Sequence, residues 1–271
     1  MAKTVFITGA SSGFGKASAK LFHQHGWNVI ATMRSPEKET ALRQLENVLV
    51  TRLDVQDATS IQNAINAGIE RFQTIDVLIN SAGYGLMGVF ESARSEQIKS
   101  LFDVNVFGLM EVTRQVLPYL RAVGSATIIN LSSMGGAVGM PFGSLYISSK
   151  FAVEGFSEAL SHELASLNIR VKIIEPGSIA TNFRENARMI DNKIPVYDPI
   201  MASSFPRYHQ LTEHLEKSSE EDVAKTIYQA ATDETNHLRY IVGADAHFFI
   251  DKRYAMSAQA FTDQMRHYFI G

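Results

Sequence analysis

Apolar and polar positions along the first 180 residues follow two alternating patterns. Between the apolar runs, apolar residues such as Phe14, Ala17 and Leu21 recur every three or four positions, which predicts helices. The runs themselves are rich in β-branched residues and predict strands at residues 5–8, 29–32, 48–53, 77–79, 127–131 and 171–174. Strands that are apolar on both faces and alternate with helices indicate a parallel sheet covered on each side. We therefore predict an α/β fold.

The last ninety residues have a different pattern. Residues 182–215 mix aromatic, charged and proline residues without a sustained period, and we interpret them as an ordered loop or lid. A helix over residues 219–231 and a strand over residues 239–242 are expected to extend the same sheet. No linker, charge run or repeat divides the sequence, so we predict one domain over residues 1–271.

Composition and charge exclude several functional classes. Hydrophobic residues make up 45% and charged residues 20%, which argues against a disordered chain. The net charge of −3 gives no basic excess for binding nucleic acid. The absence of cysteine excludes disulfides, Cys-ligated zinc and thiol nucleophiles. No apolar run approaches the ~18–20 residues of a membrane span, and the first residues lack a secretory pattern. We expect a cytoplasmic globular protein.

A glycine-rich segment, residues 8–15, lies between the first strand and the first helix. Gly9, Gly13 and Gly15 permit tight turns and let backbone N–H groups approach an anion at the helix N-terminus. Their spacing is G-x-x-x-G-x-G, which differs from the general dinucleotide fingerprint G-x-G-x-x-G. The alternative is a turn with close helix–strand packing. The segment favours, but does not establish, a dinucleotide site.

The end of the second strand distinguishes two cofactors. An NAD site places an acid there for the ribose 2′-hydroxyl, whereas an NADP site places a cation. This sequence has Arg34 and no acid before Glu37. The guanidinium of Arg34 and the hydroxyl of Ser12 can bind a 2′-phosphate, which predicts that NADP(H) is preferred over NAD(H). The alternative is that Arg34 is a solvated turn residue.

Two further polar segments follow strands and should share the carboxyl edge of the sheet. Asp54 follows the third strand and residues 80–83 follow the fourth. Asp54 can accept a hydrogen bond from an adenine amino group, or it can cap the helix that begins near Asp57. Asn80 can tie neighbouring strands together.

Tyr146, Lys150 and Ser133 form the candidate catalytic group. Tyr146 and Lys150 are four residues apart on one helix face, and Ser133 follows a strand at the carboxyl edge. An ammonium group at ~4 Å contributes ~4 kcal/mol at an effective dielectric of ~20, which would lower the pKa of Tyr146 by roughly three from its ordinary ~10. Tyr146 would then work as an acid/base near neutral pH while Ser133 holds the substrate oxygen. Asn105 is either a satisfied core amide or a helix interruption that holds a water near Lys150.

These motifs together resemble the short-chain dehydrogenase/reductase superfamily, in its soluble single-domain branch. The matching segments occur in family order and spacing at residues 8–15, 54, 80–83, 105, 133, 146–150 and 176–181. Ser81 is a departure, because the family more often has a second asparagine there. The resemblance implies a Rossmann-type, doubly wound, mostly parallel sheet of seven strands. It also implies a homodimer or homotetramer joined through two long central helices.

The resemblance assigns roles to individual residues. Asn105, Ser133, Tyr146 and Lys150 would form a catalytic tetrad, with Tyr146 as acid/base and Lys150 also bound to the nicotinamide ribose. Residues at 176–181 would flank the nicotinamide. The expected cofactor-binding residues are Gly9, Ser11, Ser12, Gly13, Phe14, Gly15, Arg34, Asp54, Val55, Asn80, Ala82, Gly83, Tyr146, Lys150, Pro176, Gly177, Ile179 and Thr181.

Other chemistries have less support. The eight histidines include no H-E-x-x-H spacing, and residues 143–146 do not form a G-x-S-x-G elbow. The leading interpretation is an NADP-dependent oxidoreductase, a carbonyl reductase that interconverts a ketone or aldehyde and an alcohol. A non-catalytic NADP(H) sensor and an epimerase or dehydratase with bound cofactor remain alternatives.

The expected substrate pocket is apolar. Its predicted lining favours a hydrophobic substrate of steroid, retinoid, aryl-ketone or lipid-like type. Each lining residue can alternatively fill the core or a subunit interface. A carboxylate-bearing substrate would need a fixed arginine, and we expect Arg184, Glu185 and Arg188 to face solvent instead. The lining consists of Tyr84, Leu86, Met87, Met134, Val138, Met140, Phe142, Phe183, Met189 and Phe205.

Overall fold

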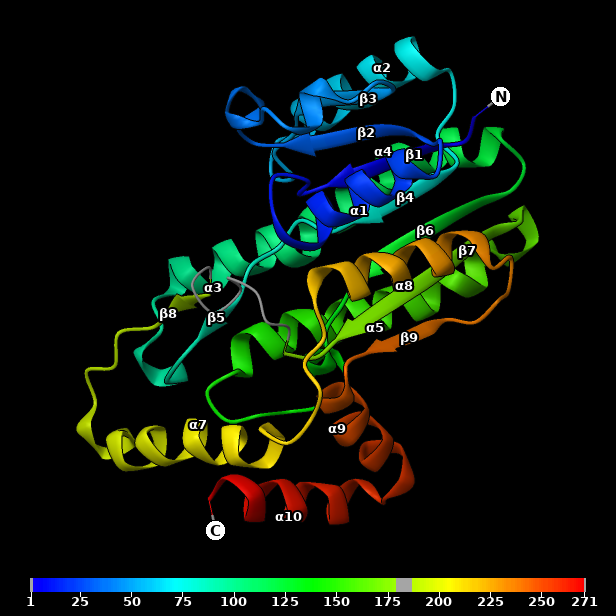
Figure 1. The fold of residues 1–271 in the computed structure, drawn as a ribbon. Coiled ribbons are helices and arrows are strands. Elements are labelled where there is room, and N and C mark those ends of the chain that lie inside the picture. The colour runs from blue at the N-terminus through cyan, green and yellow to red at the C-terminus, as the bar shows by residue number, and fades with distance from the viewer. Residues whose placement is uncertain (1, 179–186, 271) are drawn as a thin grey trace.

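A seven-stranded parallel sheet forms the centre of the protein in a computed structural model, which describes residues 2–178 and 187–270. The strand order is β3-β2-β1-β4-β6-β7-β9 (Figure 1), which is doubly wound because the order reverses beside β1. This confirms the predicted Rossmann-type fold. The strands are β1 (Thr4–Thr8), β2 (Asn28–Met33), β3 (Val48–Arg52), β4 (Val77–Asn80), β6 (Ala126–Leu131), β7 (Ile169–Pro176) and β9 (Arg239–Val242).

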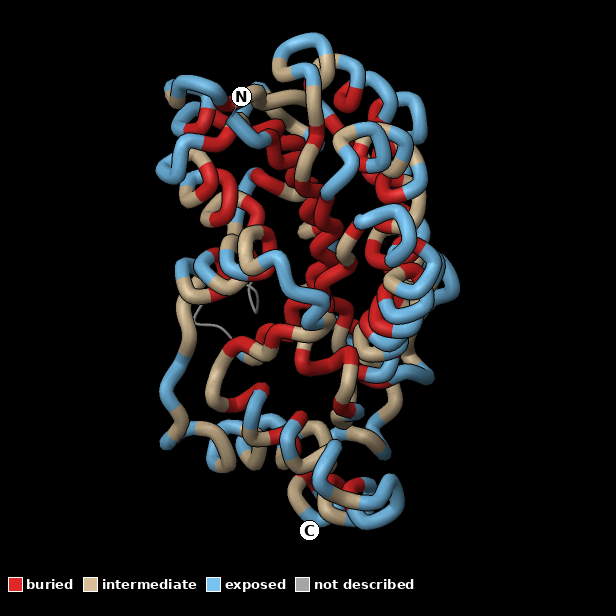
Figure 2. Tube along the Cα trace, turned by 90° about the vertical axis from the view of Figure 1, so that its right-hand side faces the viewer, coloured by how far each residue is buried: buried red, intermediate tan, exposed pale blue. Residues whose placement is uncertain are grey.

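Helices cover both faces of the sheet. Helices α1 (Gly13–Gln24) and α8 (Glu220–Thr232) pack side by side on one face. Helices α2 (Ala58–Phe72), α4 (Leu109–Ala122) and α5 (Ser144–Leu164) cover the other. Successive side chains of a strand point to opposite faces, so Val5 and Ile7 pack under α1 while Phe6 packs under α2. Figure 2 shows the result, with buried residues along the middle and exposed residues on the outer turns of the helices.

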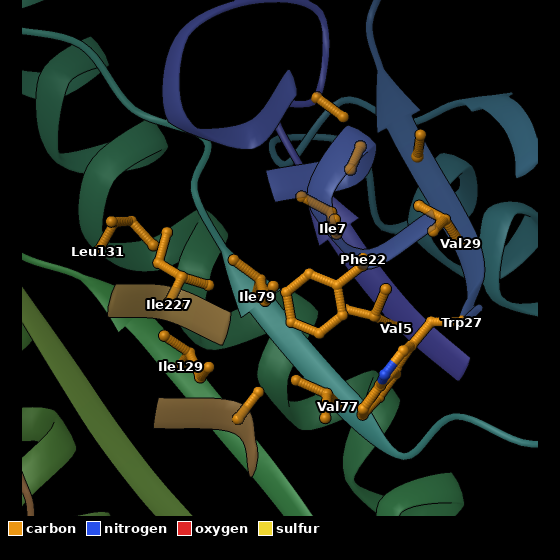
Figure 3. Close-up of a cluster of buried hydrophobic side chains, with 14 of the residues drawn as sticks. Val5, Ile7, Phe22, Trp27, Val29, Val77, Ile79, Ile129, Leu131 and Ile227 are labelled. Atoms are coloured by element: carbon orange, nitrogen blue, oxygen red, sulfur yellow. The ribbon is translucent and has the colours of Figure 1, made fainter. Parts of the chain in front are cut away.

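The core beneath α1 centres on Phe22, which is fully buried. Its ring lies beside Val5, Val77 and Ile79 of the sheet (Figure 3). Trp27 meets the same ring edge-on, with the two ring centroids 5.0 Å apart. This geometry suits the aromatic quadrupoles and adds to the burial of apolar area. The first helix is therefore fixed on the sheet directly behind the glycine-rich segment.

The segment predicted as irregular, residues 182–215, contains a helix, so that prediction was wrong in part. Helix α7 (Asp198–Thr212) has Pro199 in its first turn and Pro206 inside it. Ser204 is its one buried residue, so α7 has no wholly buried apolar face, and Pro206 in its interior argues against a helix in the sequence. The same segment supplies β8 (Arg188–Met189), which pairs with β5 (Leu86–Met87).

Two C-terminal helices were also not predicted. Helices α9 (Ala244–Ala255) and α10 (Ala258–Phe269) lie beside α7 at the lower end of Figure 1. Phe249, Phe261 and Phe269 pack there against Met134 and Val138, which follow β6. The contacts with Met134 and Val138 join segments more than a hundred residues apart in sequence. They extend the buried core beyond the edge of the sheet.

Candidate active site

A cleft runs along the carboxyl ends of the strands. It is lined by the glycine-rich segment, the ends of β2, β3, β4 and β6, the start of α5, and Arg188 of β8. This is the edge at which open α/β sheets bind ligands. Most of the predicted cofactor-binding residues line it. Four others are not among its lining residues: Gly15, Asn80, Pro176 and Gly177.

The glycine-rich segment is packed against the loop after β4. Gly9 has φ +71°, and a Cβ there would lie 2.8 Å from Ala82 Cα. Thr8 Oγ1 accepts hydrogen bonds from Ser81 N and Ala82 N, both at 3.1 Å. The alternative explanation, that a glycine is needed for close packing, is therefore confirmed for Gly9.

The same segment also fits a nucleotide phosphate. Ser12 is the N-cap residue of α1, and its side chain makes no capping hydrogen bond with the described residues. The first N–H groups of α1 therefore stay available for an anion, as in other nucleotide-binding loops. Glu220 Oε1 lies 3.9 Å from the Cβ position of Gly13, and it is a cleft residue that the sequence analysis missed.

Arg34 follows β2 directly and is exposed at the cleft, which Ser12 also lines. Within residues 2–178 and 187–270, no hydrogen bond or ion pair engages its guanidinium. Its planar donor fork is therefore accessible to a ligand phosphate from this side. The structure leaves both the predicted role and the solvated alternative open.

Asp54 is not the helix cap. Asp57 caps α2, since its Oδ1 accepts from Thr59 N at 3.0 Å and Ser60 N at 3.1 Å. The hydrogen bond from the Ser60 backbone is the main cause of a lowered pKa at Asp57. The Thr59 backbone bond and Arg52 lower this pKa further, and desolvation opposes them. The alternative proposed for Asp54 was therefore wrong, and its half-buried side chain lines the cleft.

Asn80 ties neighbouring elements together, as one reading of the sequence predicted. Its Nδ2 donates to Asn130 Oδ1 on β6 and to Thr113 Oγ1 on α4, both at 2.9 Å. The side chain is 3% exposed. It supports the loop of Ser81, Ala82 and Gly83, which does line the cleft, and it lies behind that loop.

The segment predicted to flank the nicotinamide is described in part. Pro176 ends β7 and is buried, and the backbone N–H of Gly177 bonds to Val242 O at 2.9 Å. Asp245 Oδ2 accepts from Ser178 N at 2.7 Å and from Tyr208 OH at 3.0 Å. Asp245 thus fixes the start of this segment to α7 and α9. Ile179, Thr181, Phe183, Arg184 and Glu185 lie outside the described residues.

The structure brings Ser133, Tyr146 and Lys150 together. Ser133 caps a short 3₁₀ turn after β6, Oγ accepting from Gly135 N at 3.1 Å, and it also hydrogen-bonds Tyr146. Tyr146 and Lys150 lie on the inner face of α5. Lys150 Nζ donates to Leu131 O at 2.7 Å and lies 5.8 Å from the centroid of the Tyr146 ring. The Tyr146 phenol and the Lys150 ammonium group thus line the cleft, and the Ser133 hydroxyl is hydrogen-bonded to the phenol.

The expected electrostatic effect on Tyr146 was wrong for this state of the protein. Burial raises the pKa of Tyr146 to about 12, and the Ser133 hydrogen bond opposes that rise. Burial also lowers the pKa of Lys150 to about 8, against the attraction of Glu154. The Lys150 ammonium group donates to a backbone carbonyl. Desolvation of both groups outweighs the charge effect that their spacing predicts.

Asn105 interrupts the long helix that the sequence predicted. Residues 95–102 form α3, residues 103–108 form a π-helical turn, and α4 follows. The Asn105 carboxamide accepts from Tyr84 N and donates to Tyr84 O, both at 3.0 Å, and it donates to Ser149 Oγ at 3.1 Å. Asn105 is thus a satisfied buried amide and also the centre of the interruption. π-Helical turns of this kind are frequent at functional sites.

A buried acidic pair behind the cleft was missed by the sequence analysis. Glu154 lies one helical turn after Lys150, and its Oε2 accepts from Arg239 Nε at 3.1 Å. Glu175 on β7 is fully buried, and neither of its carboxyl oxygens has a hydrogen-bond partner among the described residues. Burial, reinforced by the negative charge of Glu154, raises the pKa of Glu175 to about 7.

Several residues predicted to line a substrate pocket are core residues. Met134 and Val138 are buried against α9 and α10, and Leu86 is buried beneath α3 and α5. The core alternative holds for these three. Phe142 and Phe205, by contrast, stack with ring centroids 6.3 Å apart, and Phe205 is 42% exposed.

Within residues 2–178 and 187–270, no group of three or more His, Asp or Glu side chains is arranged to bind a metal ion. No helix in these ranges is both long enough and apolar enough to cross a membrane.

Similar proteins share both sequence and fold with this chain. An uncharacterized oxidoreductase of Schizosaccharomyces pombe is 42% identical over 78% of this chain and 88% of its own. A 3-ketodihydrosphingosine reductase of Bacteroides thetaiotaomicron is 36% identical, covering 79% and 77%. Bovine retinol dehydrogenase 8 is 34% identical, covering 83% and 76%.

Solved structures give the same picture. A short-chain dehydrogenase from Streptomyces avermitilis superposes with a TM-score of 0.83 at 31% identity, covering 98% of this chain and 97% of its own. ElxO with NADP bound has a TM-score of 0.74 at 27% identity, covering 89% and 98%. The family model "short chain dehydrogenase" matches residues 3–191. Because that match spans most of the chain and agrees with the fold, the protein belongs to the short-chain dehydrogenase family of oxidoreductases.

Proposed function

We propose that the protein is an NADP(H)-dependent carbonyl reductase or alcohol dehydrogenase acting on a largely hydrophobic substrate. The observation that carries the proposal is that Tyr146 and Lys150 line the cleft that the glycine-rich segment also lines, and that Ser133 is hydrogen-bonded to Tyr146. A sensor of NADP(H) would need the glycine-rich segment alone. The grouping of three proton-handling side chains favours catalysis.

Each residue of the group has a chemical task. Bound nicotinamide would supply or accept the hydride, and Gly9, Ser12 and Gly13 would hold its dinucleotide. In the reducing direction Tyr146 OH would give its proton to the carbonyl oxygen and become a phenolate, and in the oxidising direction the Tyr146 phenolate would take the proton of the alcohol. Ser133 Oγ, hydrogen-bonded to that phenol, orients the same oxygen. Proton transfer by a positioned side chain typically contributes about 10²–10⁴ in rate.

Lys150 and Asn105 position this group. Lys150, with its pKa lowered to about 8 by burial, can hold a proton near the phenol and donate to a ribose hydroxyl. Asn105 fixes the backbone of Tyr84 beside the cleft through its carboxamide. The π-helical turn supports this role, because it separates Asn105 from the regular hydrogen-bond ladder of α4.

The cofactor preference rests on Arg34. It is the exposed cation that follows β2 at the place where an NAD site has an acid. ElxO was solved with NADP bound, whereas a Burkholderia phymatum relative of the same fold, 24% identical, was solved with NAD. Arg34 is therefore the residue that separates the two cofactors in our proposal.

Exposed aromatic side chains support two further parts of the proposal, the hydrophobic substrate and the oligomeric state. The two relatives named for retinol and for 3-ketodihydrosphingosine support a hydrophobic substrate. Phe142 and Phe205 offer an apolar surface between the segment after β6 and α7. Phe107, in the π-helical turn before α4, is 58% exposed and Phe151, on α5, is 45% exposed, which supports a homodimer or homotetramer joined there. We also propose a cytoplasmic location.

A product assay tests the reaction class. The enzyme would be mixed with NADPH and a panel of aryl, steroid and retinoid carbonyl compounds, and NADPH loss and alcohol formation would be quantified together. The proposal predicts one alcohol formed for each NADPH consumed. Substrate conversion without net NADPH loss would indicate an epimerase or dehydratase, and NADPH binding without conversion across the panel would indicate a sensor.

A further inference from the structure

Arg188 occupies a fixed position at the mouth of the cleft. Its backbone N–H donates to Gly85 O at 2.9 Å, and its strand β8 pairs with β5. Two residues later Ile190 is buried, and its N–H donates to Met87 O at 2.8 Å. These two backbone hydrogen bonds to the neighbouring segment fix the position from which the side chain of Arg188 extends. Arg188 is exposed, as the sequence predicted, but it also lines the cleft.

The guanidinium of Arg188 lies on a supported aromatic ring. Its Cζ is 4.4 Å from the centroid of the Tyr84 ring, which is cation–π geometry. Tyr84 OH donates to Ser100 Oγ at 3.2 Å, and Asn105 holds the Tyr84 backbone. The ring is thus fixed at both ends. It keeps one face of the guanidinium covered and leaves its edge donors available.

Those donors face the cleft without an acidic partner among the described residues. Four other arginines, Arg52, Arg114, Arg239 and Arg266, each form an ion pair with Asp or Glu. Arg188 forms no such pair within the described ranges, yet it lines the same cleft as Tyr146 and Lys150. A stacked guanidinium with free edge donors matches the geometry of a carboxylate or phosphate.

We propose that Arg188 is an anion-binding subsite of the cleft, which binds a carboxylate or phosphate group of a bound reactant. The anion is either the diphosphate of the cofactor or an acidic group on an otherwise apolar substrate. Both sources require the same fork of donors. The second would make the substrate an amphipathic keto or hydroxy acid, which refines the proposed function and rests on it.

The test compares Arg188→Gln with Arg71→Gln, a matched loss of one exposed arginine charge on α2, because Arg71 also lies over an aromatic ring and forms no ion pair within the described residues. NADPH affinity would be measured by fluorescence titration. Affinity for an aryl keto acid and for its methyl ester would be measured by calorimetry on the complex with NADP⁺. Tyr84→Leu, which keeps the charge but removes the ring, and Tyr84→Phe, which keeps the ring, would be measured alongside.

The subsite predicts that Arg188→Gln loses at least tenfold in affinity for one anion, with a smaller loss in Tyr84→Leu and almost none in Tyr84→Phe or Arg71→Gln. A loss for NADPH assigns the subsite to the cofactor. A loss for the keto acid and not for its ester assigns it to the substrate. Changes below twofold for NADPH and the keto acid alike would overturn the proposal. A wild-type protein that does not bind NADPH would contradict the proposed function instead.

Discussion

Replacing Glu175 with glutamine should change how the stability of the protein depends on pH. Glu175 is fully buried, and burial with the nearby charge of Glu154 raises its pKa from about 4.5 to about 7. The folded state therefore keeps a proton that the unfolded state releases from about pH 4.5 upward. The free energy of unfolding must fall as pH rises through this window, by ~1.4 kcal/mol for each pH unit. Between pH 5 and 8 the loss from this one group is about 2–3 kcal/mol.

Urea unfolding at pH 5 and pH 8 measures the effect. Glu175→Gln cannot release a proton, so it should be more stable than the wild type at pH 8 by about 2–3 kcal/mol relative to their difference at pH 5. Glu46→Gln, at an exposed position, serves as the control. An equal difference between Glu175→Gln and wild type at the two pH values would show that Glu175 is already ionised in the folded protein.

Two further substitutions test the cofactor site and the core. Arg34→Asp should weaken NADPH binding at least tenfold while changing NADH binding much less, because it removes the cation proposed for the 2′-phosphate; fluorescence titration checks this, and equal losses for the two cofactors would refute it. Phe22→Ala should lower the free energy of unfolding by about 3–5 kcal/mol, because the ring is fully buried against β1, β4 and Trp27; a urea-unfolding loss below about 1 kcal/mol would contradict the packing described.

The central sheet could be predicted because its signal is local. Strands β1, β2, β4 and β6 are buried along both faces, and the residues that follow the strands carry the glycines, Asp54 and Ser133. In a parallel sheet all these carboxyl ends must meet at one edge. The order of strands and helices in the sequence is therefore enough to predict that the cleft lies at the carboxyl ends of the strands.

The features that escaped prediction depend on contacts between distant segments. Arg239 meets Glu154 across 85 positions of sequence, and nothing near Glu175 signals that its carboxyl group will be buried. The four-residue spacing of Tyr146 and Lys150 predicts that they share a helix face, but it does not indicate how strongly burial desolvates them. The direction of the pKa shift of Tyr146 was therefore predicted wrongly. Helix α7 has no wholly buried apolar face, so its residues gave no clear period to detect.

The rate of NADPH consumption by Tyr146→Phe tests the central claim most directly. It would be measured with the best carbonyl substrate of the wild-type protein, beside Tyr119→Phe, which removes a hydroxyl from the outer part of α4. With NADPH affinity unchanged, kcat of Tyr146→Phe should fall by about 10²–10⁴ while Tyr119→Phe keeps its activity. A Tyr146→Phe protein that binds NADPH and reduces the substrate within a few-fold of the wild-type rate would contradict the assignment of Tyr146 as the proton donor.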